Sequence, residues 1–274
     1  MMPLFVDHVS SGRSLPMIIS TVRRFTPVSI GTLAFLLVTV LSPGQTPSPN
    51  LFPVKEPSTK PPAIVIGFVG GFIAHDNLVH SEVQLAARLR KEYPAGVDVE
   101  TYESYRGTKA ERKILKLLDA NHDGILTAEE KQNARIILYG HSWGGAESIT
   151  LARALEKDNI PVLLTLQVDS VSRFRSNDII IPANVVQAVN FYQTHGIVHG
   201  DHDIRAADPA HTRTIGNFQY NYESNPLKCS EYPWYDRIFV KPHTQIECDP
   251  MIWARVESLI RASLPPMNPD GEAQ

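Results

Sequence analysis

Apolar residues between positions 63 and 264 fall into two alternating patterns. Segments in which apolar residues recur at helical spacing occur at 79–92, 108–118, 146–155 and 250–264. Short, largely apolar runs, typical of buried strands, occur at 63–69, 136–139, 161–168, 184–192 and 237–240, and the segment at 97–102 is expected to be another strand. This alternation predicts an α/β fold, with a mostly parallel sheet, helices on both faces and a ligand site beyond the carboxyl ends of the strands.

Two stretches depart from the alternation. Residues 193–235 are rich in His, Asp, Asn, Tyr and Pro without clear periodicity, so we expect a long loop excursion that forms the rim of the site. Residues 45–62 contain six prolines with serines and threonines between them, a composition that stays extended and predicts a linker. The α/β domain is therefore expected to span 63–266, with a short tail at 267–274.

The N-terminal segment has the pattern of an export leader. Two arginines precede an apolar segment at 25–41, whose uninterrupted centre is short for a membrane span and suits the core of a signal peptide. Residues 1–44 are predicted to be a signal peptide cleaved before Gln45, with Met17 as an alternative start. Because no Ala-x-Ala site is present, an uncleaved anchor is the alternative, and it would be the only membrane contact. Both forms predict an exported protein, either periplasmic, secreted or membrane-anchored.

Composition narrows the choice of partners. A chain of 274 residues with a net charge of -3 is long enough for one sizeable domain and too close to neutral to indicate nucleic acid. Its two cysteines, Cys229 and Cys248, are expected to form a disulfide in an oxidising compartment. The disulfide would close a loop that contains His243.

The clearest chemical motif follows the apolar run at 136–139. The sequence Gly140-His141-Ser142-Trp143-Gly144 leads directly into the helical pattern at 146–155. A strand, a sharp turn and a helix in this order predict a nucleophile elbow, in which flanking glycines avoid a clash and the Ser142 hydroxyl is exposed at the end of the strand. The alternative is a glycine-rich turn with an idle serine.

A serine nucleophile needs a base, and the base needs a carboxylate that holds it in the right tautomer. Asp169 directly follows the apolar run at 161–168, which places it at the same edge of the sheet as Ser142. We therefore predict Asp169 to be the acid. Asp201 and Asp203, in the segment after the next strand, are the alternatives.

His243 is the predicted base among the ten histidines. It follows the apolar run at 237–240, so a loop at the carboxyl end of a last strand would present it to Ser142. His141 is expected to pack beside the serine instead, because adjacent side chains on such a turn point apart.

An acyl-transfer site also needs hydrogen-bond donors for the developing oxyanion. The backbone amide of Trp143 is expected to supply one donor. The second is expected from the loop after the first strand, where Gly70-Gly71-Phe72 allows close approach of the backbone. The sequence does not choose between the amides of Gly71 and Phe72.

A second motif, at 119–130, matches the loop of an EF-hand. Glycine stands at loop position 6 and glutamate at position 12, with oxygen-bearing side chains at positions 1, 3, 5 and 9. The expected calcium ligands are Asp119, Asn121, Asp123, the carbonyl of Ile125, Thr127 and Glu130. A single loop predicts a structural calcium clip between a helix and a strand, and an Asp-Gly turn with solvated acids is the alternative.

A histidine-rich stretch at 194–203 is a weaker metal candidate. Its ligands would be His195, His199, Asp201, His202 and Asp203. Their spacing is loose for a fixed zinc geometry, so we expect solvated or hydrogen-bonded side chains instead.

Together, the elbow at Ser142, the later Asp169 and the still later His243 resemble the α/β-hydrolase superfamily, in particular its lipase-like and esterase-like members, over residues 63–264. The resemblance implies that these three residues form a triad that cleaves small-molecule or lipid carboxylic esters through an acyl-enzyme. The loop at 119–130 and the lack of a first antiparallel hairpin depart from the common pattern, so the N-terminal strands are reduced. Thioester or amide cleavage, and a catalytically silent calcium-stabilised binding protein, remain alternatives.

Overall fold

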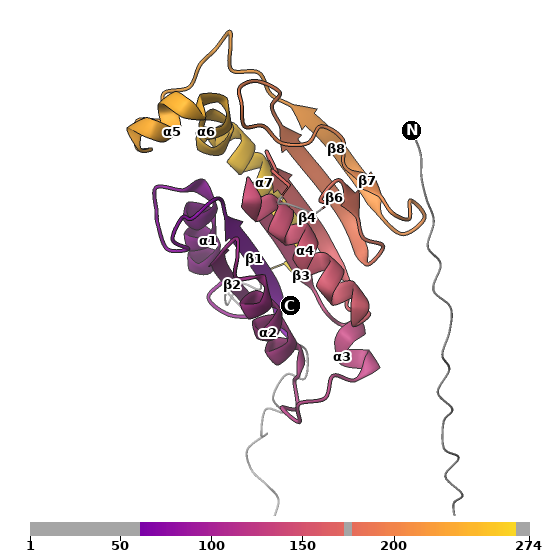
Figure 1. Ribbon diagram of the computed structural model, residues 1–274. Coiled ribbons are helices and arrows are strands. Elements are labelled where there is room, and N and C mark those ends of the chain that lie inside the picture. The colour runs from indigo at the N-terminus through magenta and orange to yellow at the C-terminus, as the bar shows by residue number, and fades with distance from the viewer. Residues whose placement is uncertain (1–60, 173–176, 267–274) are drawn as a thin grey trace, which may run out of the picture. The chain divides into compact units, whose positions relative to one another are not determined.

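Six parallel strands form the central sheet of the domain (Figure 1). Residues 61–172 and 177–266 are described in this computed structural model. The strands are β1 (Ala63–Val69), β2 (Val97–Glu103), β3 (Ile136–His141), β4 (Val162–Val168), β6 (Val185–Tyr192) and β8 (Arg213–Gln219). Their order across the sheet is β2-β1-β3-β4-β6-β8, and every neighbouring pair is parallel. The predicted α/β class with a mostly parallel sheet is confirmed.

Helices cover both faces of this sheet because its central strands are apolar on both sides. Within β1, Val65 packs into one core cluster, and Ile64 and Ile66 pack into the other, as alternation along a strand requires. The first cluster includes side chains of α1 (Ser81–Glu92) and α7 (Pro250–Ser263). The second includes side chains of α2 (Gly107–Leu118) and α4 (Trp143–Lys157). Burial of each large aliphatic side chain contributes about 1.5–3 kcal/mol.

The remaining elements are short and lie between the larger ones. They are α3 (Ala128–Gln132), α5 (Trp234–Phe239), α6 (Lys241–Cys248) and a separate two-stranded parallel sheet of β5 (Ile180–Ile181) and β7 (Arg205–Ala206). Helix α7 begins with Asp249 as its N-cap: the Asp249 side chain accepts a hydrogen bond from the Met251 amide at 2.9 Å, and Pro250 occupies the first helical position.

Two predictions about the last part of the chain were wrong. The apolar run at 237–240 is no strand: it forms the end of α5 and the junction with α6, and Ile238 and Phe239 are exposed. The sheet ends instead with β8, inside the stretch that was expected to be a loop excursion. Because β8 is an edge strand whose residues are all partly or fully exposed, its sequence lacks the apolar run on which strand prediction depends.

The predicted leader at 1–44, most of the linker at 45–62 and the tail at 267–274 lie outside the described residues. Within the described part of the chain, no helix combines the length and apolarity needed to cross a membrane.

Candidate active site

Ser142 lies at the junction between β3 and α4, at the carboxyl end of a central strand. Its backbone has φ 56° and ψ -128°, a strained conformation for a residue with a side chain. The two elements leave no residue between them except Ser142 itself. The predicted strand, sharp turn and helix are therefore present at this position.

The glycines on either side of Ser142 are required by close backbone packing. A Cβ atom on Gly140 would lie within 3.0 Å of the backbone of Gly144, and a Cβ atom on Gly144 would lie within 3.0 Å of the Phe68 carbonyl. Real Cβ atoms essentially never make such contacts with backbone atoms. These two positions accept only glycine without a shift of β1 or of the turn.

Asp169 is fully buried directly after β4, also with a positive φ of 42°. Its Oδ1 accepts hydrogen bonds from the amides of Gln193, at 3.1 Å, and Gly200, at 2.8 Å. Its Oδ2 accepts a hydrogen bond from Nε2 of Gln193 at 2.8 Å and lies 2.7 Å from Nδ1 of His243. These partners hold the carboxylate in one orientation towards the imidazole.

His243 is buried in α6, so the prediction that a loop carries it was wrong. The helix is tied to the preceding segment by the disulfide between Cys229 and Cys248, whose Cα atoms are 5.9 Å apart. This disulfide agrees with the expected pairing. The buried ring of His141 packs against that of His243 with 4.4 Å between centroids, and burial lowers the pKa of His141 well below its usual value.

A cavity of about 300 Å³ opens at these side chains. Ser142, Trp143 and His243 line it together with Gly70 and Gly71 from the loop after β1. The structure thus brings the predicted nucleophile, base and oxyanion loop to one cavity. Phe72 is 84% exposed, and its ring packs edge-on against that of Trp143.

The alternative acids and the histidine-rich stretch are placed differently. Asp201 accepts a hydrogen bond from Ser172 at 3.2 Å, and Asp203 is exposed. Nδ1 of His195 lies 3.2 Å from Oε1 of Glu223, and the ring of His202 stacks on that of Tyr192. The carboxylate that meets His243 is that of Asp169, and the stretch at 194–203 forms no metal cluster among the described residues.

The EF-hand-like loop connects α2 to α3. Both oxygens of Asp119 accept backbone hydrogen bonds, from Asp123 at 3.2 Å and from Gly124 at 2.9 Å. Gly124 has a φ of 80°, as expected of the glycine at loop position 6. Thr127 and Glu130 form a capping box at the start of α3, and the backbone and side-chain hydrogen bonds at Thr127 lower the pKa of Glu130.

A further cluster beside the cavity was missed from the sequence. His80 and Glu247 line the cavity, and Glu82 lies next to them without any exposed surface. Burial raises the pKa of Glu247 to about 8 and raises that of Glu82 well above its usual range. One sequence signal could have revealed Glu82, since it stands three and four residues before Leu85 and Ala86 on the apolar face of α1.

No protein-family model and no curated protein sequence matches this chain. Similar solved structures include Est1E from Butyrivibrio proteoclasticus, at 10% identity and a TM-score of 0.37, covering 74% of this chain and 89% of that one. They also include a hyperthermophilic esterase from Pyrobaculum calidifontis, at 11% identity and a TM-score of 0.36. That match covers 73% of this chain and 78% of the esterase. The thioesterase RedJ from Streptomyces coelicolor matches at 12% identity and a TM-score of 0.34. That match covers 78% of this chain and 97% of the thioesterase.

Proposed function

We propose that this protein is a serine hydrolase of the α/β-hydrolase type that cleaves carboxylic esters through an acyl-enzyme. The observation that carries the proposal is the convergence of Ser142, His243 and Asp169. The serine and the histidine line one cavity, and Nδ1 of the histidine lies 2.7 Å from a buried carboxylate of Asp169. A strained serine between two obligatory glycines adds to this support.

In the proposed reaction, Asp169 keeps the proton of His243 on Nδ1, which leaves Nε2 free to act as base. The Ser142 hydroxyl attacks the ester carbonyl carbon as Nε2 takes its proton. The oxyanion that forms accepts hydrogen bonds from the Trp143 amide and from the Gly71 or Phe72 amide. Collapse breaks the bond to the alkoxy oxygen, and His243 returns the proton to the leaving alcohol. Water then hydrolyses the acyl-enzyme by the same steps.

The size of the cavity favours short acyl groups. A volume of about 300 Å³ lies at the lower end of the usual range for ligand pockets. Aliphatic side chains form part of its wall, from Ile73, Val171, Val198 and Val240. We therefore propose a small-molecule ester with a short apolar acyl chain as the substrate.

Hydrolysis of a short and a long p-nitrophenyl ester tests this proposal. The wild-type protein should cleave the short ester faster, and Ser142→Ala should remove the turnover. Thr150→Ala is a matched control in α4 and should leave turnover unchanged, because the Thr150 hydroxyl donates to the Ala146 carbonyl of the same helix. Equal turnover by wild type and Ser142→Ala would contradict the proposal. A silent scaffold would cleave neither ester while remaining folded.

We also propose that the loop at 119–130 binds a structural calcium ion. The support is the pattern of oxygen-bearing side chains, the positive φ of Gly124 and the lowered pKa of Glu130, which keeps that carboxylate ionised. Calcium would there join the end of α2 to the start of α3 and would take no part in the catalytic step.

Finally, we propose that the chain is exported, since the Cys229–Cys248 disulfide suits an oxidising compartment.

A further inference from the structure

The carboxyl group of Glu82 is fully buried at the start of α1. Its side chain has 0% exposure, and neither oxygen accepts a hydrogen bond from any donor in the part of the chain that the structure describes. Transfer of an unpaired carboxylate into a protein interior is costly, so such a group is expected to be protonated or to meet a cation. Glu82 is held in this position by the first turn of α1.

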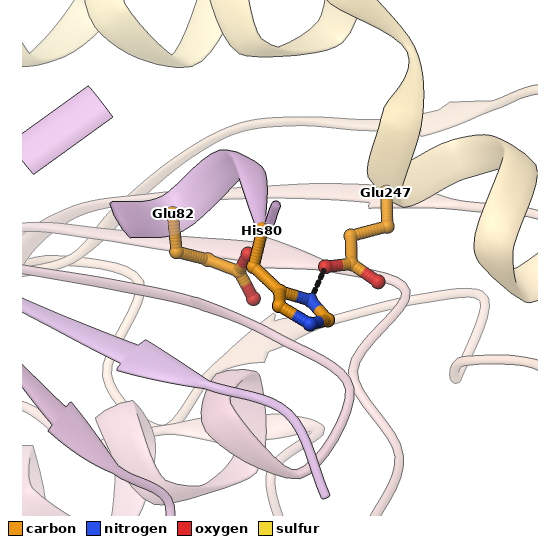
Figure 2. Close-up of side chains that lie close together, drawn as sticks. All are labelled: His80, Glu82 and Glu247. Atoms are coloured by element: carbon orange, nitrogen blue, oxygen red, sulfur yellow. Dashed lines mark hydrogen bonds and ion pairs between the residues drawn. The ribbon is translucent and has the colours of Figure 1, made fainter. Parts of the chain in front are cut away.

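The side chains of His80 and Glu247, two residue types that can bind metals, lie close to that of Glu82, with His80 between the two glutamates (Figure 2). His80 directly precedes α1, and Glu247 lies near the end of α6, 167 residues further along the chain than His80. Nδ1 of His80 is 2.6 Å from Oε1 of Glu247. One donor atom from each of His80, Glu82 and Glu247 lies within 4.8 Å of the others, and all three residues are buried. The start of α1 and the end of α6, which are far apart in the chain, thus bring their donor atoms together.

The donor set suits a divalent transition metal. Zinc can be bound by one imidazole nitrogen and two carboxylate oxygens. With these three protein ligands, water occupies the remaining coordination positions of the ion. Two carboxylates would also neutralise the charge of the ion, which resolves the burial of two acids side by side. His141 adds a second imidazole, with Nδ1 3.4 Å from Glu247 and 3.8 Å from Glu82.

We propose that His80, Glu82 and Glu247 form a binding site for a divalent transition metal, with zinc the best match to the donors. An ion can reach the site because His80 and Glu247 line the catalytic cavity. Glu247 stands four residues after His243 on α6, so the ion would fix the helix that carries the base. This site is separate from the calcium loop and does not depend on ester cleavage.

Zinc binding to the full-length protein, first stripped with a chelator, tests this proposal by isothermal titration calorimetry and thermal melting. The wild type should bind one zinc per chain at this site and melt at a higher temperature with zinc, because an ion that binds only the folded state stabilises it. Glu82→Gln should weaken binding at least about tenfold. Glu103→Gln is the matched control, since Glu103 forms an exposed pair with His75, at 2.9 Å, outside the cluster.

Cobalt substitution gives a second readout that needs no variant. Cobalt bound to the wild type should show the intense visible absorption of a four- or five-coordinate site, and zinc should displace it. The proposal is overturned if the stripped wild type binds neither ion. It is also overturned if folded Glu82→Gln binds zinc as tightly as Glu103→Gln, because the ion then lies elsewhere. Should Glu82→Gln fail to fold, His80→Gln takes its place in the same comparison.

Discussion

Nδ1 of His243 lies 2.7 Å from Oδ2 of Asp169, although 74 residues separate them in the chain. The aspartate comes from the end of a central strand and the histidine from a helix outside the sheet. Backbone amides at Gln193 and Gly200 hold the other carboxylate oxygen. The pair is thus positioned by three separate segments, and it is the part of the site from which the proposed base chemistry follows.

Replacing Asp169 should therefore impair catalysis. Asp169→Asn would favour the wrong tautomer of His243, and we expect kcat to fall by about 10⁴-fold. Steady-state hydrolysis of a p-nitrophenyl ester measures this loss. Asp201→Asn is the control, because Asp201 bonds Ser172 and is expected to change kcat by less than about tenfold. A larger loss in Asp201→Asn than in Asp169→Asn would assign the acid to Asp201.

The elbow glycine at position 140 should tolerate no side chain. Gly140→Ala places a Cβ atom against the backbone of Gly144, and we expect the free energy of unfolding to fall by about 3 kcal/mol or more. Urea denaturation measures the change. Gly124→Ala in chelator is the comparison, since its φ of 80° is strained but its Cβ meets no atom within 4 Å. That variant should lose only about 1–2 kcal/mol, and an equal or smaller loss in Gly140→Ala would refute the packing argument.

The disulfide should stabilise the folded protein. It joins residues 19 apart, and closing a loop of that length is worth about 3 kcal/mol through the entropy of the unfolded chain. The Cys229→Ser/Cys248→Ser double variant should lose this amount in urea denaturation. A reducing agent should destabilise the wild type and leave the double variant unchanged. Equal stability of wild type under oxidising and reducing conditions would contradict the prediction.

Calcium should raise the melting temperature. An ion present at 100 times its Kd and bound only to the folded state adds about 2.7 kcal/mol, and each kcal/mol raises Tm by about 2–4 °C in a domain of this size. Calorimetry with calcium and with chelator measures the shift, which Glu130→Gln should abolish. Glu129→Gln removes a neighbouring exposed charge and should keep it. The same Tm in both solutions would count against the calcium clip.

Local sequence signals predicted where Ser142 and Asp169 lie in the fold because each residue directly follows a buried strand. Ser142 and Asp169 stand at the ends of β3 and β4, whose apolar runs are unmistakable. The helix that carries His243 could not be predicted in this way. The preceding α5 is a short helix whose apolar side chains are exposed. Its apolar run therefore has the sequence pattern of a buried strand although the segment is neither buried nor a strand.

Edge position and long-range contact account for the other errors. The side chains of β8 are polar or only partly buried, since the strand pairs on one side only, and no apolar run marks it. The cluster of His80, Glu82 and Glu247 depends on α1 and α6 meeting in space. The local sequence gives one sign of this cluster, which is the charged residue Glu82 on the apolar face of α1.

Labelling by a fluorophosphonate probe tests the central claim most directly, because the probe reacts only with an activated serine. We expect the folded wild type to be labelled once, with the adduct on the peptide that contains Ser142. Ser142→Ala should remain unlabelled, and Thr150→Ala should be labelled like the wild type. An unlabelled wild type that melts cooperatively, or an adduct on another serine, would contradict the assignment of Ser142 as the nucleophile.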